Sequence, residues 1–304
     1  MHSGGIQEAN STSRLTLRNQ VPTVVCYRSG RFSSWGFETS QEDFSDPEID
    51  VGEWFKVYLD RKEYQDASDN SWPRSYDDVK RAFRDFLRQL YARIREELES
   101  AVLRGTTWHD ASVEFIFSVP TTWTAMSVTQ TFEGIIHEAG FTSGGVNHKV
   151  VIGLTEPEAA AIHTFATEKE TYSDGQIILV VDAGGGTTDL ALLKANKQTN
   201  GQMGLSELDN VRGLELGSVE IDVAFEDMVL ERLLASKATL GLSDRACEKA
   251  ARKMARENFR PHKENFGSDM SDRQNMKRID IPGVSDSISI PHAGIRGGGL
   301  MVTK

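Results

Sequence analysis

Three consecutive glycines lie between two aspartates in the segment VVDAGGGTTD, residues 180–189, and two threonines follow the glycines. Apolar, strand-like residues flank the segment, so the glycines are expected at the tip of a β-hairpin. Glycine at a hairpin tip permits positive φ angles and leaves successive backbone N–H groups free of side chains, an arrangement that binds phosphate. The sequence therefore predicts an anion site at Gly184, Gly185 and Gly186.

Polar side chains beside the glycines extend this prediction. Asp182 ends the preceding strand and is suited to orient water around a magnesium ion, and Thr187 is suited to hydrogen-bond a terminal phosphate oxygen. The segment is not a P-loop, because no Gly-Lys-Ser/Thr sequence follows, and it is not a dinucleotide fingerprint, because no helix begins after the glycines. A flexible hairpin turn without a ligand is the alternative interpretation.

Composition limits the classes of partner. The chain has 304 residues, which suggests about two domains, and a net charge of -11. This acidic balance argues against a general affinity for nucleic acid or anionic membrane. The sequence shows no apolar run of about 20 residues and no signal-peptide pattern, so a cytoplasmic protein is expected, with a nuclear location as the alternative. Cys26 and Cys247 are expected to be buried thiols.

Hydrophobic periodicity and turn residues predict alternating helices and strands. A long helix is expected from Ser75, with a Ser-x-x-Asp cap, to Gly105, and residues 177–181 are expected to form a fully buried strand. Irregular structure is expected at 261–286. A short strand pair is expected within 30–39. Further strands are expected within 14–27, 112–119, 149–154, 190–193, 204–210, 287–290 and 299–304, and further helices within 53–60, 125–141, 157–166, 212–234 and 243–259.

Four segments resemble one protein family in order along the chain. Residues 181–193, VDAGGGTTDLALL, closely resemble the second phosphate-binding motif of the actin-like ATPase superfamily, and most closely that of the heat shock protein 70 (DnaK-type) chaperones. The family pattern is Asp-x-Gly-Gly-Gly-Thr-x-Asp. Residues 151–162, VIGLTEPEAAAI, are similar to the first connecting motif, 115–141 to the Val-Pro strand and its helix, and 215–222, ELGSVEID, to a Leu-Gly-Gly-x-x-x-Asp segment.

The resemblance implies an α/β protein with the actin-like ATPase, or ribonuclease H-like, fold in an incomplete two-lobed nucleotide-binding domain. Residues 1–13 would be a polar tail, 14–176 lobe I with a peripheral subdomain at 30–110, and 177–304 lobe II. ATP or ADP with Mg²⁺ would be the ligand. Residues 112–119, 150–154, 176–183 and 189–194 would be central strands, and the carboxylates of Glu156 and Asp182 would face a common cleft.

The resemblance also implies roles for single residues. Glu156 would orient or deprotonate the attacking water, and Lys56 would stabilise charge on the transferring phosphoryl group; a helix cap and a solvated lysine are the respective alternatives. Asp182 and Asp189 would serve the metal. The remaining nucleotide contacts would come from Gly184, Gly185, Gly186, Thr187, Thr188, Gly217 and Lys263, with Glu248 and Arg252 as an alternative to Lys263 for adenosine.

The sequence departs from the family pattern in three ways. The first phosphate hairpin, Asp-x-Gly-Thr-Thr, and the later Gly-Gly adenine motif do not occur, and Ser218 and Val219 replace a glycine and an acidic residue. We therefore expect a domain truncated at both ends, with weak nucleotide binding, no hydrolysis above background and unpaired strand edges that favour aggregation or an unknown protein partner. A catalytically inactive pseudo-ATPase or interaction module is the alternative; a sugar or acetate kinase is disfavoured by TEPEAAAI.

Overall fold

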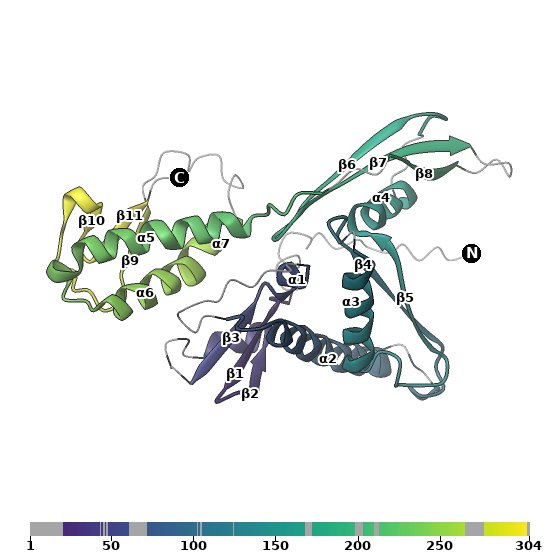
Figure 1. Ribbon diagram of the computed structural model, residues 1–304, viewed down its shortest axis with the longest axis horizontal. Coiled ribbons are helices and arrows are strands. Elements are labelled where there is room, and N and C mark those ends of the chain that lie inside the picture. The colour runs from purple at the N-terminus through teal and green to yellow at the C-terminus, as the bar shows by residue number, and fades with distance from the viewer. Residues whose placement is uncertain are drawn as a thin grey trace, which may run out of the picture. The chain divides into compact units, whose positions relative to one another are not determined.

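The computed structural model describes residues 21–42, 44, 46, 48–60, 72–101, 103, 105–123, 125–167, 172–197, 203–209, 213–264 and 277–302. Within these residues the protein is mixed α/β, with several small sheets rather than one large sheet (Figure 1). The chain divides into two compact units, residues 1–159 and residues 160–304. The lobe boundary predicted at residue 176 stays a prediction.

The first unit begins with a three-stranded antiparallel sheet. Its strands are β1 (Val24–Arg28), β2 (Arg31–Trp35) and β3 (Ile49–Glu53), in the order β2-β1-β3. The strand pair predicted within 30–39 is wrong, because β2 pairs with β1 and residues 36–41 form a 3₁₀ helix. Thr39 Oγ1 donates to the Gly36 carbonyl at 2.7 Å inside that helix. The part of the 14–27 prediction before residue 21 lies outside the described residues.

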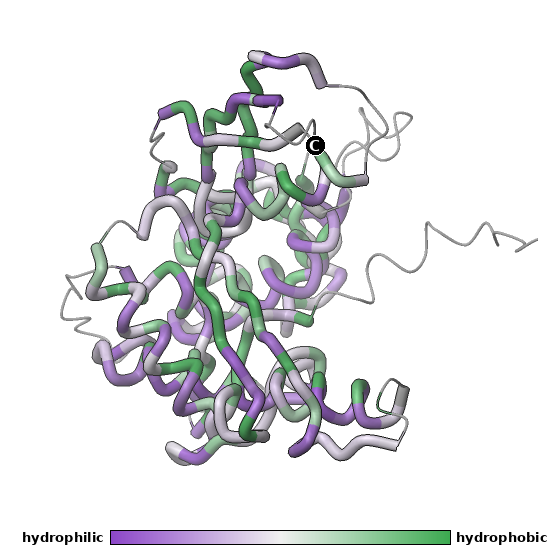
Figure 2. Tube along the Cα trace, turned by 90° about the vertical axis from the view of Figure 1, so that its right-hand side faces the viewer, coloured by the Kyte–Doolittle hydropathy of each residue, from purple (hydrophilic) through white to green (hydrophobic). Residues whose placement is uncertain are grey.

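Helix α2 (Tyr76–Ala101) forms the centre of the first unit. It begins at the predicted cap, where Ser75 Oγ accepts a hydrogen bond from the Asp78 N–H at 3.2 Å. Its apolar side chains recur every three or four residues, and Phe83 and Phe86 pack against Phe55 with ring centroids 5.1 and 5.6 Å apart. The predicted cap and apolar face are therefore confirmed. Hydrophobic and hydrophilic segments alternate along the helices (Figure 2).

A parallel strand pair completes the first unit. Strands β4 (Val113–Val119) and β5 (His148–Thr155) pair in parallel, and α3 (Met126–Ala139) connects them. Gly140 ends α3 with a φ of 107°, a left-handed conformation that suits glycine. Helix α4 (Glu156–Thr167) begins directly after β5. These elements agree with the strands and helices that the sequence predicts there.

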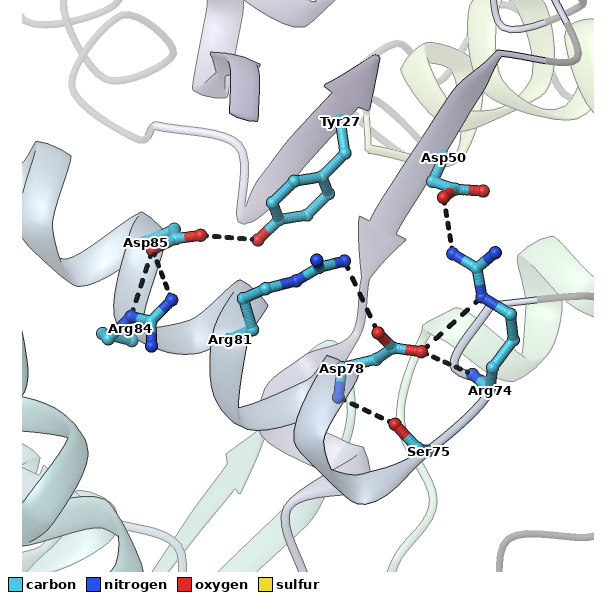
Figure 3. Close-up of polar contacts among 8 residues, drawn as sticks. All are labelled: Tyr27, Asp50, Arg74, Ser75, Asp78, Arg81, Arg84 and Asp85. Atoms are coloured by element: carbon cyan, nitrogen blue, oxygen red, sulfur yellow. Dashed lines mark hydrogen bonds and ion pairs between the residues drawn. The ribbon is translucent and has the colours of Figure 1, made fainter. Parts of the chain in front are cut away.

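A polar network attaches β1 to α2 (Figure 3). The Tyr27 hydroxyl donates to Asp85 Oδ2 at 3.0 Å, and the guanidinium of Arg84 binds Asp85 Oδ1 at 3.1 Å. The guanidinium of Arg81 lies 4.3 Å from the centre of the Tyr27 ring. Tyr27 and Asp85 are both buried. Burial, followed by the Asp85 charge, raises the pKa of Tyr27 far above its ordinary value of 10.0.

The second unit contains a glycine-tipped sheet and a helical part. Strands β6 (Ile177–Ala183), β7 (Thr188–Lys197) and β8 (Met203–Asp209) form an antiparallel sheet in that order, so the predicted hairpin and the following strand are confirmed. Helix α5 (Val219–Leu240) leads into α6 (Asp244–Lys253), the π-helical segment Met254–Phe259 and α7 (Arg260–Glu264). The remaining described elements are β9 (Lys277–Asp280), the 3₁₀ helix Pro291–Ala293, β10 (Ile295–Arg296) and β11 (Gly299–Val302).

Three predictions for the second unit need correction. Strand 177–181 is not fully buried: Ala161 and the sheet cover one face, while Ile177, Leu179 and Val181 are 56–60% exposed on the other. A continuous apolar run does not reveal that only one face is covered. Residues 261–286 include α7 and β9 among those described, and 287–290 form no strand, because only Ile290 makes a β-bridge, to Ile295.

Replacing Tyr27 with Phe tests the network of Figure 3. We expect the free energy of unfolding of the first unit to fall by about 1–3 kcal/mol, because Asp85 loses a buried hydrogen bond. Because the folded-state pKa of Tyr27 is raised, its contribution is present below pH 10.0 and is lost as the pH rises above that value. All five tryptophans lie in residues 1–159, so tryptophan fluorescence during urea unfolding reports on this unit.

The matched control is Tyr76→Phe, which removes a hydroxyl that donates to the Leu59 carbonyl at 3.2 Å. The wild type and the Tyr76→Phe variant should lose stability more steeply above pH 10.0 than Tyr27→Phe does. Equal alkaline slopes in all three proteins would show that Tyr27 is not the titrating group.

Candidate functional site

The strand register defines the glycine hairpin. Asp182 pairs with Asp189 and Ala183 with Thr188, so residues 184–187 make the turn. The Gly184 N–H donates to the Thr187 carbonyl at 2.8 Å and closes it. On the other side, Thr188 exchanges two backbone hydrogen bonds with Leu214, of 2.9 and 2.8 Å. The turn is therefore held by its own Gly184–Thr187 hydrogen bond and by the bonds between Thr188 and Leu214.

The conformation of the three hairpin glycines differs from the one that the sequence suggested. None of Gly184, Gly185 and Gly186 is among the described glycines with positive φ, so the expectation of left-handed conformations here is wrong. A Cβ atom on Gly184 would lie 3.1 Å from the Thr187 carbonyl oxygen, whereas one on Gly185 would meet nothing within 4 Å. A side chain at Gly184 would thus make a tight contact within the turn, whereas one at Gly185 would enter open space.

Helix α5 binds the hairpin through its first backbone N–H groups. The Ser218 N–H donates to the Gly184 carbonyl at 3.1 Å, and the Val219 N–H donates to the Gly185 carbonyl at 2.9 Å. A Cβ atom on Gly217 would lie 2.2 Å from the Gly185 oxygen, so only glycine permits this approach. Gly217, expected as a nucleotide contact, therefore has a packing role in the structure.

These bonds direct two backbone donors to the other side of the turn. In a trans peptide group the N–H points opposite to the C=O, so fixing the carbonyls of Gly184 and Gly185 toward α5 turns the N–H groups of Gly185 and Gly186 away from it. Among the described residues, no acceptor binds the N–H of Gly185, Gly186 or Thr187. We call these three N–H groups the nest. Successive free N–H groups of this kind bind anions.

Two carboxylates lie on one face of the same hairpin. Asp182 and Asp189 are directly opposite each other. Asp189 is buried and accepts a hydrogen bond from Thr187 Oγ1 at 2.5 Å, while Asp182 is half-buried and has no partner among the described residues. Thr188 Oγ1 instead donates to the Leu216 carbonyl at 2.7 Å. The described residues contain no group of three or more His, Cys, Asp or Glu placed to hold a metal ion.

Lys263 binds the first turn of α5. Its Nζ lies 2.8 Å from the Ser218 carbonyl oxygen and 2.8 Å from Asp222 Oδ2, to which Arg260 Nε also approaches at 3.4 Å. The other adenosine candidates lie on α6, where Glu248 is exposed and Arg252 pairs with Glu226 at 3.4 Å. The choice between Lys263 and the α6 pair stays open.

In the first unit, the structure brings Lys56 and Glu156 together. Lys56 lies in α1 (Phe55–Tyr58), and its Nζ forms an ion pair with Glu156 Oε1, the carboxylate that begins α4, 100 residues later in the sequence. Phe55 is fully buried against α2 and anchors α1. Trp54, before this helix, has a φ of 56°, which is uncommon for a residue other than glycine.

Capping of α4 explains why Glu156 is available for this pair. Glu158 Oε2 accepts hydrogen bonds from the Thr155 N–H and from Thr155 Oγ1, both at 2.8 Å. Glu158 therefore makes the capping contact that was the alternative role for Glu156. The Thr-x-x-Glu spacing of residues 155–158 is a sequence signal for a capping box, which sequence reasoning missed here.

No protein-family model matches the chain, and no curated protein matches it. Among the described residues, no helix is both long enough and apolar enough to cross a bilayer.

Two glycine substitutions test how α5 holds the hairpin. Gly217→Ala should lower the stability of the second unit by about 1–3 kcal/mol, because the added methyl group overlaps the Gly185 carbonyl. Gly185→Ala should change it by less than about 0.5 kcal/mol, since its Cβ enters open space. Hydrogen exchange of the Ser218 and Val219 amides measures the effect locally. Tryptophan fluorescence, which reports on the first unit, should not change.

Protection of both amides in Gly217→Ala at the wild-type level would contradict the docking of α5 on the hairpin.

Proposed function

We propose that this chain binds ATP or ADP with Mg²⁺ through an actin-like ATPase domain of the heat shock protein 70 kind, with the phosphates held by the 182–189 hairpin. The observation that carries the proposal is the nest, in which three successive N–H groups lack an acceptor among the described residues. The resemblance of residues 181–193 to the family's phosphate-binding motif is the reason for proposing a nucleotide as the ligand. The nest provides backbone N–H donors of the type that phosphate oxygens require.

The carboxylates of the hairpin fit the metal in this proposal. Mg²⁺ keeps most of its water ligands and takes only one or two protein carboxylates. Asp182, which has no partner among the described residues, is suited to accept hydrogen bonds from such waters. Asp189, already bonded to Thr187 Oγ1, would hold that threonine in place beside the phosphate.

Lys56 and Glu156 have the chemistry that phosphoryl transfer needs. A carboxylate orients or deprotonates the attacking water, and an ammonium group stabilises the charge that develops on the phosphoryl oxygens. Their ion pair supports this assignment, because it holds both groups at one place although 100 residues separate them. In the proposed function Glu156 positions the water and Lys56 balances charge.

Phosphate binding is tested with Gly185→Val. The β-branched side chain would occupy the open space over the nest and block its donors, so affinity for Mg-ATP and for tripolyphosphate should fall at least about tenfold. Isothermal titration calorimetry measures both ligands, and adenosine should bind more weakly than either. Because nothing lies within 4 Å of that Cβ position, the variant should remain folded.

Gly134→Val is the matched control, since the Cβ position of Gly134 is also open and lies on α3, outside the hairpin. Its affinities should equal those of the wild type. If Gly185→Val binds tripolyphosphate as tightly as Gly134→Val does, the phosphates are not held at the nest.

An interaction module without turnover is the second candidate function. The observation in its favour is the uncovered face of β6, where Ile177, Leu179 and Val181 are each more than half exposed. Contiguous apolar exposure of this kind often marks a protein-binding surface.

Phosphate release tests turnover, which the proposed nucleotide binding does not require. We expect the 304-residue chain to release phosphate from ATP no faster than its Glu156→Gln variant, because one hairpin supplies donors to the phosphates from one side only and each missing donor costs about a hundredfold in rate. Malachite green or labelled ATP measures the rate. A wild-type rate that falls about a hundredfold or more in Glu156→Gln, with unchanged ATP affinity, would instead establish the ATPase.

A further inference from the structure

Each of the two hydrogen bonds from α5 to the hairpin ends on a peptide group whose N–H belongs to the nest. The peptide group that contains the Gly184 carbonyl also contains the Gly185 N–H, and the group that contains the Gly185 carbonyl also contains the Gly186 N–H. A peptide whose carbonyl accepts a hydrogen bond becomes polarised, and its N–H becomes a stronger donor. The N–H groups of Ser218 and Val219 therefore strengthen two of the three donors in the nest.

Helix α5 adds its own electrostatic field to this arrangement. It is 22 residues long, and the N-cap residue, Ser218, makes no side-chain capping bond. The positive end of the helix is instead directed at the hairpin carbonyls, which accept its first N–H groups. The nest lies on the far side of these carbonyls from the helix.

Lys263 stands at the other end of the same chain of bonds. Its ammonium group binds the Ser218 carbonyl at 2.8 Å, and that carbonyl shares a peptide group with the Val219 N–H. The bonds therefore run without a break from Lys263 through Ser218 and Val219 to the Gly185 carbonyl, and so to the Gly186 N–H. Two peptide groups separate the ammonium from the nest.

The ammonium N–H groups of Lys263 already bind acceptors at the start of α5. Its three N–H bonds match three acceptors: the Ser218 carbonyl at 2.8 Å, Ser218 Oγ at 3.4 Å and Asp222 Oδ2 at 2.8 Å. The lysine side chain is only 15% exposed, and that of Asp222 only 7%. A direct contact between Lys263 and a nucleotide would require these bonds to break.

We infer that Lys263, anchored by Asp222, is a positioning residue that strengthens the phosphate nest through the first turn of α5 without touching the ligand. The inference rests on the proposed function for the identity of the anion, a nucleotide polyphosphate. In this inference Lys263 acts from α5, on the side of the hairpin away from the nest. The buried Asp222 carboxylate holds the lysine ammonium at the Ser218 carbonyl.

Three variants distinguish positioning from direct contact. Lys263→Met should weaken tripolyphosphate binding about three- to tenfold, in the range expected for a charge at a helix terminus, and Lys263→Arg should restore most of it. Asp222→Asn decides between the mechanisms. Direct attraction by Lys263 predicts tighter binding when this negative charge is removed, whereas positioning predicts weaker binding because the lysine loses its anchor.

A spectroscopic measurement without ligand tests the coupling itself. Labelling with [1-¹³C]glycine and [¹⁵N]glycine selects the amides of glycines that follow another glycine, of which the chain has six: those of Gly5, Gly145, Gly185, Gly186, Gly298 and Gly299. In Lys263→Met the Gly186 amide proton should shift upfield, because its peptide group is less polarised, and Lys263→Arg should reverse the shift. Gly145, in the first unit, is the internal reference.

The two readouts separate this inference from the proposed function. If the wild type binds no tripolyphosphate but the Gly186 proton shifts as expected, the proposed ligand is wrong and the coupling is supported. If tripolyphosphate binds and the Gly186 proton does not move in Lys263→Met, the coupling is refuted and phosphate binding is retained. Tighter binding by Asp222→Asn would also overturn the inference, in favour of direct attraction.

Discussion

The second unit depends on the close approach of Gly217 to the Gly185 carbonyl. At a separation where a Cβ atom would lie 2.2 Å from the oxygen, only a glycine lets the first N–H groups of α5 reach the hairpin. That contact satisfies the helix terminus, which has no side-chain cap, and it fixes which way the hairpin peptide groups face. The direction of the Gly185 and Gly186 N–H groups in the nest is a consequence of this orientation. Without it, the same three glycines would be a turn with no defined donor direction.

In the first unit, packing and capping side chains position the candidate residues Lys56 and Glu156. Phe55 is buried among the aromatic rings of α2, which fixes the short helix that carries Lys56, and the capping box of α4 uses Glu158. Phe55 thus makes the packing contact beside Lys56, and Glu158 makes the capping contact near Glu156, so that Lys56 and Glu156 can pair with each other. A long lysine side chain and a carboxylate at a helix start would otherwise be free to make many alternative contacts, and their pairing would be a weak surface interaction.

Elements with strong local signals could be predicted from the sequence, because local chemistry determines them. The Ser75 cap with the apolar period of α2, and the hairpin around the glycines, are examples. Features that depend on distant parts of the chain could not be predicted. The exposed face of β6 depends on which side is covered, and the partners of Lys263 depend on a residue 45 positions away in the sequence. The hairpin glycines were predicted to permit positive φ angles, whereas none of them is among the described glycines with positive φ, and it is at Gly217 that the structure leaves no room for a Cβ atom.

The replacement of the expected glycine and acidic residue by Ser218 and Val219 is also understandable from this geometry. These positions act through backbone N–H groups, which every residue except proline supplies, so their side chains can change without loss of the contact. Gly185 presents the opposite case. Its φ is not left-handed and its Cβ position is open, so the fold does not require glycine there, and glycine carries a cost in backbone entropy. A close approach from outside the protein, to N–H groups that lack acceptors among the described residues, is the requirement that would account for a glycine at this position.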